Sequence, residues 1–324
     1  EPSMARIDSI LKLVKEQGAS DLHMTTGAPP MVRINGEITP VPYEQLTPEL
    51  AELLLFEIMD DNLKAKYDRD KDVDFAYEVP GVLRVRCNVY EQSKGVAGAF
   101  RVLPSEIPTI EKLGLPDHLL KLTDLSRGLV VVTGPPGTGK SSTLAAMLDH
   151  INRTSRKHIL TIEDPIEFRH TNQLAMVTQR EVGRNTPSFA QALRAALRED
   201  PDVIMVGEMR DTETMALALS AAGTGQLVFA TLHTMSAAQT VDRILDSFDG
   251  ERQSQVRLML SESLRGVLAQ RLLRRKDGHG RVLALETLIG NSAVAALIRE
   301  RKTFQLASVI QTGNNEGMQA MDES

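Results

Sequence analysis

The sequence predicts an α/β protein in which a parallel sheet fills the second half of the chain and a smaller α+β domain comes before it. From Gly128 onward, short apolar segments typical of buried strands alternate with amphipathic segments typical of helices. This alternation is typical of a parallel sheet covered by helices on both faces. The expected strands cover 129–133, 158–163, 203–207 and 227–231, and the expected helices lie near 140–152, 187–199 and 211–222.

The first domain, expected over residues 5–103, mixes helical and strand patterns. Residues 6–17 carry an apolar stripe at helical spacing, and Gly18 supplies a stop. The last three strand segments follow one another closely, which predicts antiparallel pairing. Strands are expected at 20–25, 31–34, 73–78, 82–90 and 96–103, and helices at 48–59 and 60–67.

Residues 104–116 are expected to be a linker, because they contain three prolines and little periodicity. The second domain is then expected over 117–324. Its final part, 236–310, has mainly helical composition, with Arg274–Lys276 as a solvated helix end. A break at Lys276–Gly280 precedes a strand-like segment at Val282–Thr287.

Composition excludes several classes of protein. The chain has 324 residues and a net charge of −6. This acidic balance argues against broad electrostatic capture of nucleic acid, so no nucleic-acid partner is expected, although a local basic channel stays open. A single cysteine, Cys87, rules out a disulfide within the chain and a cysteine-cluster metal site, and it suits a reducing cytoplasm. No segment approaches the ~20 apolar residues that cross a bilayer, so no direct membrane span is expected. Any membrane association would come through partners.

One glycine-rich segment has the pattern of a phosphate loop, or Walker A motif. It lies between an expected strand and an expected helix, which is the order that this motif requires. Backbone N–H groups at such a helix start bind anions, the lysine reaches the β- and γ-phosphates, and the serine hydroxyl ligates Mg²⁺. The alternative is a chance Gly/Pro-rich turn. The expected ATP-binding residues are Gly134, Pro135, Pro136, Gly137, Thr138, Gly139, Lys140, Ser141 and Ser142.

Two further expected strands end in carboxylates. The first ends at Glu163, with Asp164 and Glu167 just after it, and the second leads directly into Glu208, as a Walker B strand leads into its acid. Carboxyl ends of parallel strands collect at one sheet edge, where ATP hydrolysis needs acids to orient water and to hold the Mg²⁺ shell. The alternatives are an acidic turn before Pro165 and a strand that matches by chance.

The fourth expected strand is followed by His233, with Thr231 and Thr234 beside it. A hydroxyl and an imidazole at this edge can sense whether a γ-phosphate is present. A histidine at a strand end is often only structural, so this alternative stays open.

Three arginines of the first domain are candidates to reach a phosphate from outside the second domain. Arg84 and Arg86 alternate on one strand and therefore share a face, and Arg101 lies on the next strand. They act as arginine fingers in this interpretation. The alternative is a solvated strand face.

The strings GPPGTGKS, ILTIEDPIEF, REDPDVIMVGEMRD and TGQLVFATLHT together resemble the secretion-ATPase superfamily of type II secretion, type IV pili and type IV secretion. Within it, nearly the whole chain is similar to the PilT-type pilus retraction ATPases. The supporting strings are ASDLHMTTGAPPMVRINGE, RVRCNVYEQSKG, MLSESLRGVLAQRL and IQTGNNEGMQAMD. A single cysteine and a short N-terminal part argue against the extension ATPases of the same superfamily.

The resemblance implies a PAS-like first domain, a RecA-like P-loop ATPase domain and a homohexamer that uses ATP and Mg²⁺ to retract pili. It implies a cytoplasmic protein, peripheral at the inner face of the membrane, with a PilC-like platform protein and other pilus ATPases as partners. Carried onto this sequence, it makes Glu163 the catalytic base and Glu208 the Walker B acid, which reaches the metal through water. Lys140 and Ser141 bind phosphate and Mg²⁺, His233 belongs to the "His box", and Arg84, Arg86 and Arg101 approach the nucleotide.

The chain departs from the family pattern at four positions. Members usually have Thr and Ser where this chain has Pro136 and Thr138, and their His box usually reads AAETGH where this chain has Gly223 and Gln226. The changes at Gly223 and Gln226 are expected to affect the coupling between nucleotide sensing and motion more than they affect hydrolysis. The family chain also normally continues further, which implies that this one is trimmed or short.

Two other functions stay open. The altered His box favours an accessory or non-retracting paralogue that binds ATP and assembles with another pilus or secretion ATPase. A ring ATPase of DNA transfer is disfavoured by the retraction-type strings and by the acidic charge.

Overall fold

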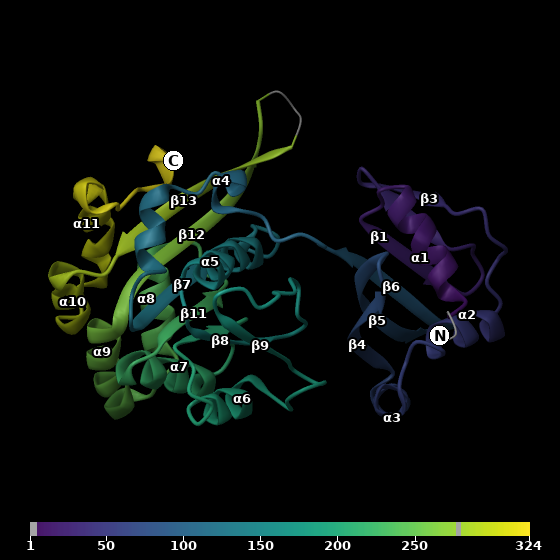
Figure 1. Ribbon diagram of the computed structural model, residues 1–324, viewed down its shortest axis with the longest axis horizontal. Coiled ribbons are helices and arrows are strands. Elements are labelled where there is room, and N and C mark those ends of the chain that lie inside the picture. Colours follow the sequence, from purple (N-terminus) through teal and green to yellow (C-terminus); the bar gives the residue numbers. More distant parts are fainter. Residues whose placement is uncertain (1–4, 277–279) are drawn as a thin grey trace. The chain divides into compact units, whose positions relative to one another are not determined.

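The computed structural model describes residues 5–276 and 280–324 (Figure 1). Contacts divide these residues into two units, the first ending at Ser105 and the second beginning at Glu106. Each unit has its own sheet and its own apolar core. The helix α4 (Ile110–Leu113), which lies in the stretch expected to be a linker, belongs to the second unit, and its Ile110 is buried there.

The first unit is a six-stranded antiparallel sheet in the order β3-β2-β1-β6-β5-β4, with helices packed on one face. Four apolar residues of the first helix recur at helical spacing and are buried, each contributing about 1.5–3 kcal/mol. The α+β class expected for this first domain is confirmed. The elements are α1 (Ile7–Glu16), β1 (Asp21–Thr25), β2 (Met31–Ile34), β3 (Glu37–Pro40), α2 (Pro48–Phe56), α3 (Asp61–Asp70), β4 (Asp72–Val79), β5 (Leu83–Gln92) and β6 (Gly95–Leu103).

The other face of this sheet carries charge. On β5 and β6, Val85, Cys87 and Phe100 face the helices, whereas Arg86 and Arg101 lie opposite each other on the exposed face. The strand β3 was not predicted, because all its residues are exposed and it forms the sheet edge, where no buried partner imposes an alternating pattern.

The second unit contains a seven-stranded sheet in the order β13-β12-β7-β11-β10-β8-β9. All neighbouring pairs are parallel except β12 and β13. The predicted RecA-like α/β fold with a parallel sheet is therefore confirmed. The strands are β7 (Gly128–Thr133), β8 (His158–Glu163), β9 (Met176–Glu181), β10 (Val203–Val206), β11 (Leu227–Leu232), β12 (Leu264–Arg274) and β13 (Arg281–Ile289).

Helices cover both faces of this sheet. On β7, Leu129 and Val131 face one set of helices, and Val130 and Val132 face the other, so the central strand is buried on both sides. The second set is α5 (Lys140–Thr154), α4 and a short 3-10 segment at Asp117–Leu122. The first set is α6 (Phe189–Ala196), α7 (Thr212–Thr224), α8 (Ala237–Asp246), α9 (Gly250–Ser263), α10 (Ser292–Arg299) and α11 (Leu306–Thr312).

The prediction that 236–310 is mainly helical is wrong at β12. This segment is rich in Leu and Arg, which favour helices, but it pairs with β7 and β13 and its first seven residues are mostly buried. Burial between two strands overrides the local preference, and Arg274 ends a strand rather than a helix. The expected strand at 282–287 is confirmed as β13, whereas most of the expected break at 276–280 falls on residues 277–279, outside the described residues.

Candidate active site

Four parallel strands end at the same edge of the second sheet and bring the predicted site residues to one place. The phosphate loop follows β7, Glu163 ends β8, Glu208 follows β10, and His233 follows β11. Because parallel strands share their direction, their carboxyl ends form one edge of the sheet. The structure therefore gathers residues that are up to about a hundred positions apart in the chain.

The phosphate loop connects β7 to α5 through a backbone that needs glycine. Gly134 has φ 142°, and a Cβ atom there would lie 2.4 Å from the carbonyl oxygen of Gln270 on β12. Gly139, with φ 87°, precedes the first residue of α5. The Thr138 hydroxyl donates to the Pro135 carbonyl at 2.9 Å, so the loop is braced from within, while Pro136 is exposed.

Lys140 opens α5 and turns its ammonium back over the loop. Its Nζ donates to the carbonyls of Gly134 at 2.8 Å and Pro135 at 3.0 Å. Burial lowers the pKa of Lys140, although the nearby carboxylates of Glu208 and Glu167 oppose this effect. Ser141 and Ser142 follow in the first turn of the helix and are partly exposed.

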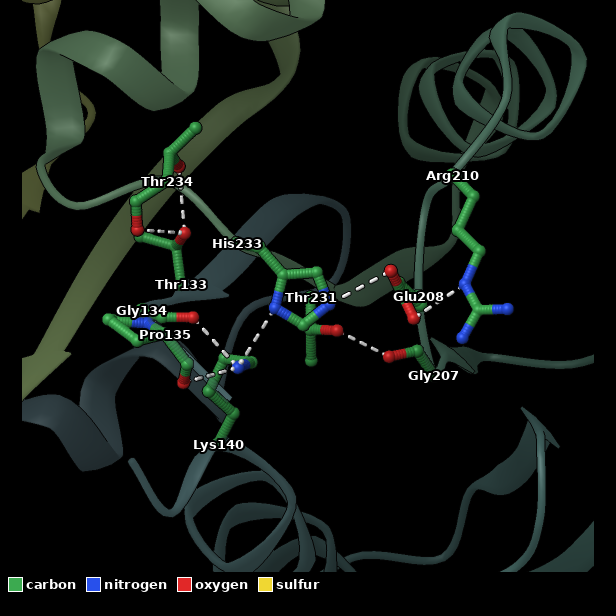
Figure 2. A network of polar contacts seen from close by, with 10 residues as sticks. All are labelled: Thr133, Gly134, Pro135, Lys140, Gly207, Glu208, Arg210, Thr231, His233 and Thr234. Carbon is green, nitrogen blue, oxygen red and sulfur yellow. Dashed lines mark hydrogen bonds and ion pairs between the residues drawn. The ribbon is translucent and has the colours of Figure 1, made fainter. Parts of the chain in front are cut away.

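A chain of polar contacts crosses the site from Lys140 to Arg210 (Figure 2). The Nζ of Lys140 lies 3.3 Å from Nδ1 of His233, whose Nε2 lies 2.9 Å from Oε1 of Glu208. The other oxygen of Glu208 lies 2.7 Å from Nε of Arg210. His233 thus bridges the phosphate loop and the end of the Walker B strand.

Threonine hydroxyls connect the strand ends to one another. Thr231 donates to the carbonyl of Gly207, just before Glu208. Thr133, the last residue of β7, donates to the Thr234 carbonyl at 2.8 Å, and the two hydroxyls lie 2.7 Å apart. These contacts join the end of β11 to the residue after β10, and the loop that carries His233 to the end of β7.

Glu163 is buried, on the sheet face that α5 covers. Its Oε1 accepts hydrogen bonds from Thr161 Oγ1 at 2.6 Å and from Gln179 Nε2 at 3.1 Å. Burial raises the pKa of Glu163 to about 7, although these two donors and the backbone N–H of Glu167 stabilise the charged form. A carboxyl group with a pKa near the working pH is suited to accept and release a proton.

The three candidate arginines all lie in the first unit. Arg101 Nε lies 3.0 Å from Asp21 Oδ1, and Arg86 Nε lies 3.9 Å from Asp74 Oδ1. Arg84 lies opposite Glu78 in the pairing of β5 with β4. Hydrogen bonds from Ser20 and Arg101 hold the pKa of Asp21 below its ordinary value, against the effect of burial. The approach of these arginines to a nucleotide stays a prediction.

Two residues that touch the predicted site, Arg210 and Gln179, were not predicted from the sequence. Arg210 lies two positions after Glu208 and pairs with it, and an arginine so close to a strand-end acid was a usable signal. Gln179 lies on β9, which was not predicted because this edge strand has few apolar residues and only one buried position. Without the strand, nothing in the sequence placed Gln179 beside Glu163.

The two departures in the His box lie far from the phosphate loop. Gly223 is near the end of α7, and Gln226 precedes β11, whereas His233 follows that strand. A strand of six residues places its two ends about 20 Å apart. These positions therefore have no part in the polar network around Lys140.

Comparison with known proteins agrees with this geometry. The family model described as type II/IV secretion system protein matches residues 1–319. The chain belongs to the type II/IV secretion system protein family. This confirms the superfamily expected from the sequence motifs.

Individual members of the type II/IV secretion system family are similar along almost the whole chain. The type IV pilus retractation ATPase PilT of Pseudomonas aeruginosa is 51% identical over 98% of this chain and 92% of its own length. A twitching motility protein of Neisseria gonorrhoeae is 48% identical over 98% of this chain and 85% of its own. A crystal structure of the pilus retraction motor PilT with bound ADP superposes with a TM-score of 0.89, at 48% identity, over 99% of this chain and 96% of that chain. The resemblance to PilT-type proteins is thereby confirmed.

Within 5–276 and 280–324, none of the helices combines the length and the apolar character that crossing a bilayer requires.

Proposed function

We propose that this chain is an ATP-hydrolysing motor that retracts type IV pili. The observation that carries the proposal is the series of contacts from Lys140 through His233 to Glu208. It connects the phosphate loop to the acid that follows β10. The similarity to a PilT structure with bound ADP supports the choice of nucleotide. The similarity to a pilus retractation ATPase and to a twitching motility protein supports the kind of work done.

ATP binds with its phosphates over the start of α5. Backbone N–H groups of the loop from Gly134 to Gly139 and the first residues of α5, including Ser141 and Ser142, point to the phosphates. Lys140 exchanges its contacts with the Gly134 and Pro135 carbonyls for contacts with β- and γ-phosphate oxygens. Pro135 and Pro136 have no N–H, so the donors of this loop come from its other residues.

Glu163 is the base of the reaction. A water molecule gives a proton to its carboxylate as the oxygen attacks the γ-phosphorus, and the bond to the β–γ bridging oxygen breaks, leaving ADP and phosphate. Burial places the pKa of Glu163 at about 7, so the group accepts this proton readily and returns it to solvent. Lys140 offsets the charge that develops on the phosphates.

Mg²⁺ fits the oxygen donors at this edge. No group of three or more His, Cys, Asp or Glu side chains that could hold a metal occurs in the parts of the chain that the structure describes. A magnesium ion takes few protein ligands and keeps water and phosphate in its shell. The Ser141 hydroxyl and, through a water molecule, the Glu208 carboxylate would hold it. When bound, it supplies charge neutralisation at the phosphates.

His233 links nucleotide state to the strands. A γ-phosphate that draws Lys140 away removes the partner of Nδ1, and the imidazole then reorients between the phosphate and Glu208. Thr231 and Thr234 transmit this change to β10 and β7 through their hydrogen bonds. Hydrolysis thereby alters contacts at the carboxyl ends of these strands.

The working assembly is a homohexamer. Arg84, Arg86 and Arg101 of one subunit approach the nucleotide of the next, and turnover moves one subunit against another. The motor works in the cytoplasm, peripheral at the inner face of the membrane, on a PilC-like platform protein, and other pilus ATPases act alongside it. No nucleic acid takes part.

Pilus dynamics in a strain that lacks the gene test this function. We expect hyperpiliation without retraction, restored by the intact chain and not by Glu163→Gln, which in vitro should bind ATP without hydrolysing it. Retraction that persists in the deletion strain would overturn the proposal. The accessory role, favoured only by Gly223 and Gln226, instead predicts weak ATPase activity with normal hexamers and retraction only when a second ATPase is present.

A further inference from the structure

Gln179 on the edge strand β9 stands out among groups near the site that the proposed reaction does not use. In the parallel pairing of β8 with β9, Gln179 lies opposite Thr161, and Thr161 shares a strand face with Glu163. The three side chains therefore project from the same face of the sheet. Thr161 Oγ1 and Gln179 Nε2 both donate to the same oxygen of Glu163, Oε1, at 2.6 and 3.1 Å.

Two donors on one oxygen constrain the carboxyl group. They set its rotation about the Cγ–Cδ bond, and with it the direction of the second oxygen. A hydrogen bond to a carboxylate also favours its charged form, and this matters in a buried site where desolvation favours the neutral form. Gln179 thus acts on both the orientation and the ionisation of Glu163.

The same amide also holds the segment that follows β8. Its Nε2 lies 2.9 Å from the carbonyl oxygen of Phe168, and its Oε1 accepts the backbone N–H of His170 at 2.8 Å. A carboxylate in place of this amide could accept from His170 but, when ionised, could not donate to Glu163 or Phe168. The pattern of partners therefore requires an amide, with its nitrogen facing Glu163.

We infer that Gln179 is a positioning residue for hydrolysis, which orients the Glu163 carboxylate and ties the 164–170 segment to β9. This rests on the proposed role of Glu163 as the base. The charged neighbour that acts on Glu163 from the following segment is Glu167, which disfavours ionisation, and Gln179 and Thr161 counter it from β9 and β8.

The test compares Gln179→Leu with Gln191→Leu, the same change at an exposed position of α6. For Gln179→Leu we expect kcat to fall about 10-fold or more, with the KM for ATP and the affinity for ADP unchanged. The acid limb of the kcat–pH profile should move up by about one pH unit, because a donor to the carboxylate is lost. Gln191→Leu should match the unmodified chain in all four measurements.

Thr161→Val separates the two roles of Gln179, because it removes the other donor to Oε1 without touching Phe168 or His170. It should move the acid limb in the same direction. If Gln179→Leu lowers kcat but leaves the acid limb unmoved, or leaves both unchanged, the inference is wrong. If turnover survives in Glu163→Gln, Glu163 is not the base and the proposed mechanism is wrong. That outcome differs from the results that would overturn the role of Gln179 alone.

Discussion

The Nε2 atom of His233 lies 2.9 Å from Oε1 of Glu208, and this contact determines which tautomer the ring adopts. The ammonium of Lys140, 3.3 Å from Nδ1, can only donate, so Nδ1 accepts and the proton resides on Nε2. Glu208 then receives that proton's hydrogen bond while its other oxygen pairs with Arg210. The imidazole thus lies between a cation and an anion that would otherwise attract each other directly.

Removing the His233 side chain, which acts as a spacer between Lys140 and Glu208, should impair turnover. In His233→Ala, Lys140 and Glu208 are free to pair with each other, which draws the lysine from the phosphates and the acid from the metal shell. We expect kcat to fall about 10-fold or more, with a much smaller change in ADP affinity. Steady-state ATPase assays and ADP titration check this, with His150→Ala on α5 as the matched histidine control. Equal kcat values for the two variants would contradict the spacer role.

The ionisation of Glu163 should appear in both activity and stability. Turnover requires the charged base, so kcat should rise as the pH passes through about 7. Because the folded pKa lies above the ordinary value of 4.5, the folded state holds the proton more tightly than the unfolded state. Its contribution to stability is complete below 4.5 and is lost as the pH rises towards 7.

Glu163→Gln isolates this stability effect. The variant cannot ionise at this position, so its free energy of unfolding should fall less than that of the unmodified chain between pH 4.5 and 7, by on the order of 2 kcal/mol. Chemical denaturation at several pH values measures the difference. If the free energies of unfolding of the two chains change in parallel with pH, the pKa of Glu163 is not raised in the folded state.

Arg101 should act on the nucleotide of a neighbouring subunit. We expect Arg101→Ala to lower kcat about 100-fold or more, as loss of an arginine finger does. Mixing Arg101→Ala chains with Glu163→Gln chains, each inactive alone, should restore part of the activity, because some interfaces then combine an intact arginine with an intact base. Arg69→Ala, at an exposed arginine of the same unit, is the control. No recovery on mixing would place the arginine's action within its own chain.

Gly134 should tolerate no side chain, whereas Gly137 in the same loop should tolerate alanine better. An alanine Cβ at 134 would lie 2.4 Å from the Gln270 carbonyl oxygen at φ 142°, whereas at 137 it would meet nothing within 4 Å at φ 78°. We expect Gly134→Ala to lower the free energy of unfolding by about 2–4 kcal/mol and Gly137→Ala by about 1–2 kcal/mol. Denaturant unfolding of both variants checks the order, and a reversed order would mean that β12 does not pack on the loop.

The altered His box should affect stability more than chemistry. Gly223 lies in α7, and a Cβ atom there would meet nothing within 4 Å, so Gly223→Ala should stabilise the chain by about 0.5–1 kcal/mol and leave kcat unchanged. Gly225→Ala is the contrasting change, because its φ of 134° suits only glycine and the variant should be destabilised. Thermal unfolding with ATPase assays measures both. A change in kcat for Gly223→Ala would show coupling to the site across the sheet.

Prediction from sequence worked where the structural signal is local. The phosphate loop lies directly between a strand and a helix, so its whole pattern is contained in neighbouring residues. The apolar stripe of α1 likewise lies within the helix itself. Prediction failed at the segment of β12, where helix-favouring residues are held as a strand by β7 and β13. It also passed over the edge strands β3 and β9, which carry no strong apolar alternation.

By itself, the sequence determined the order of strands and helices around the phosphate loop and the acids that end two of those strands, because neighbouring residues carry that information. Only the tertiary structure decided which groups meet there. Lys140 and His233 are 93 positions apart, and Gln270 braces α5 through Thr143 from 127 positions away. Gln179 reaches Glu163 only because β9 pairs with β8 in one register, which follows from sheet packing and not from local preference.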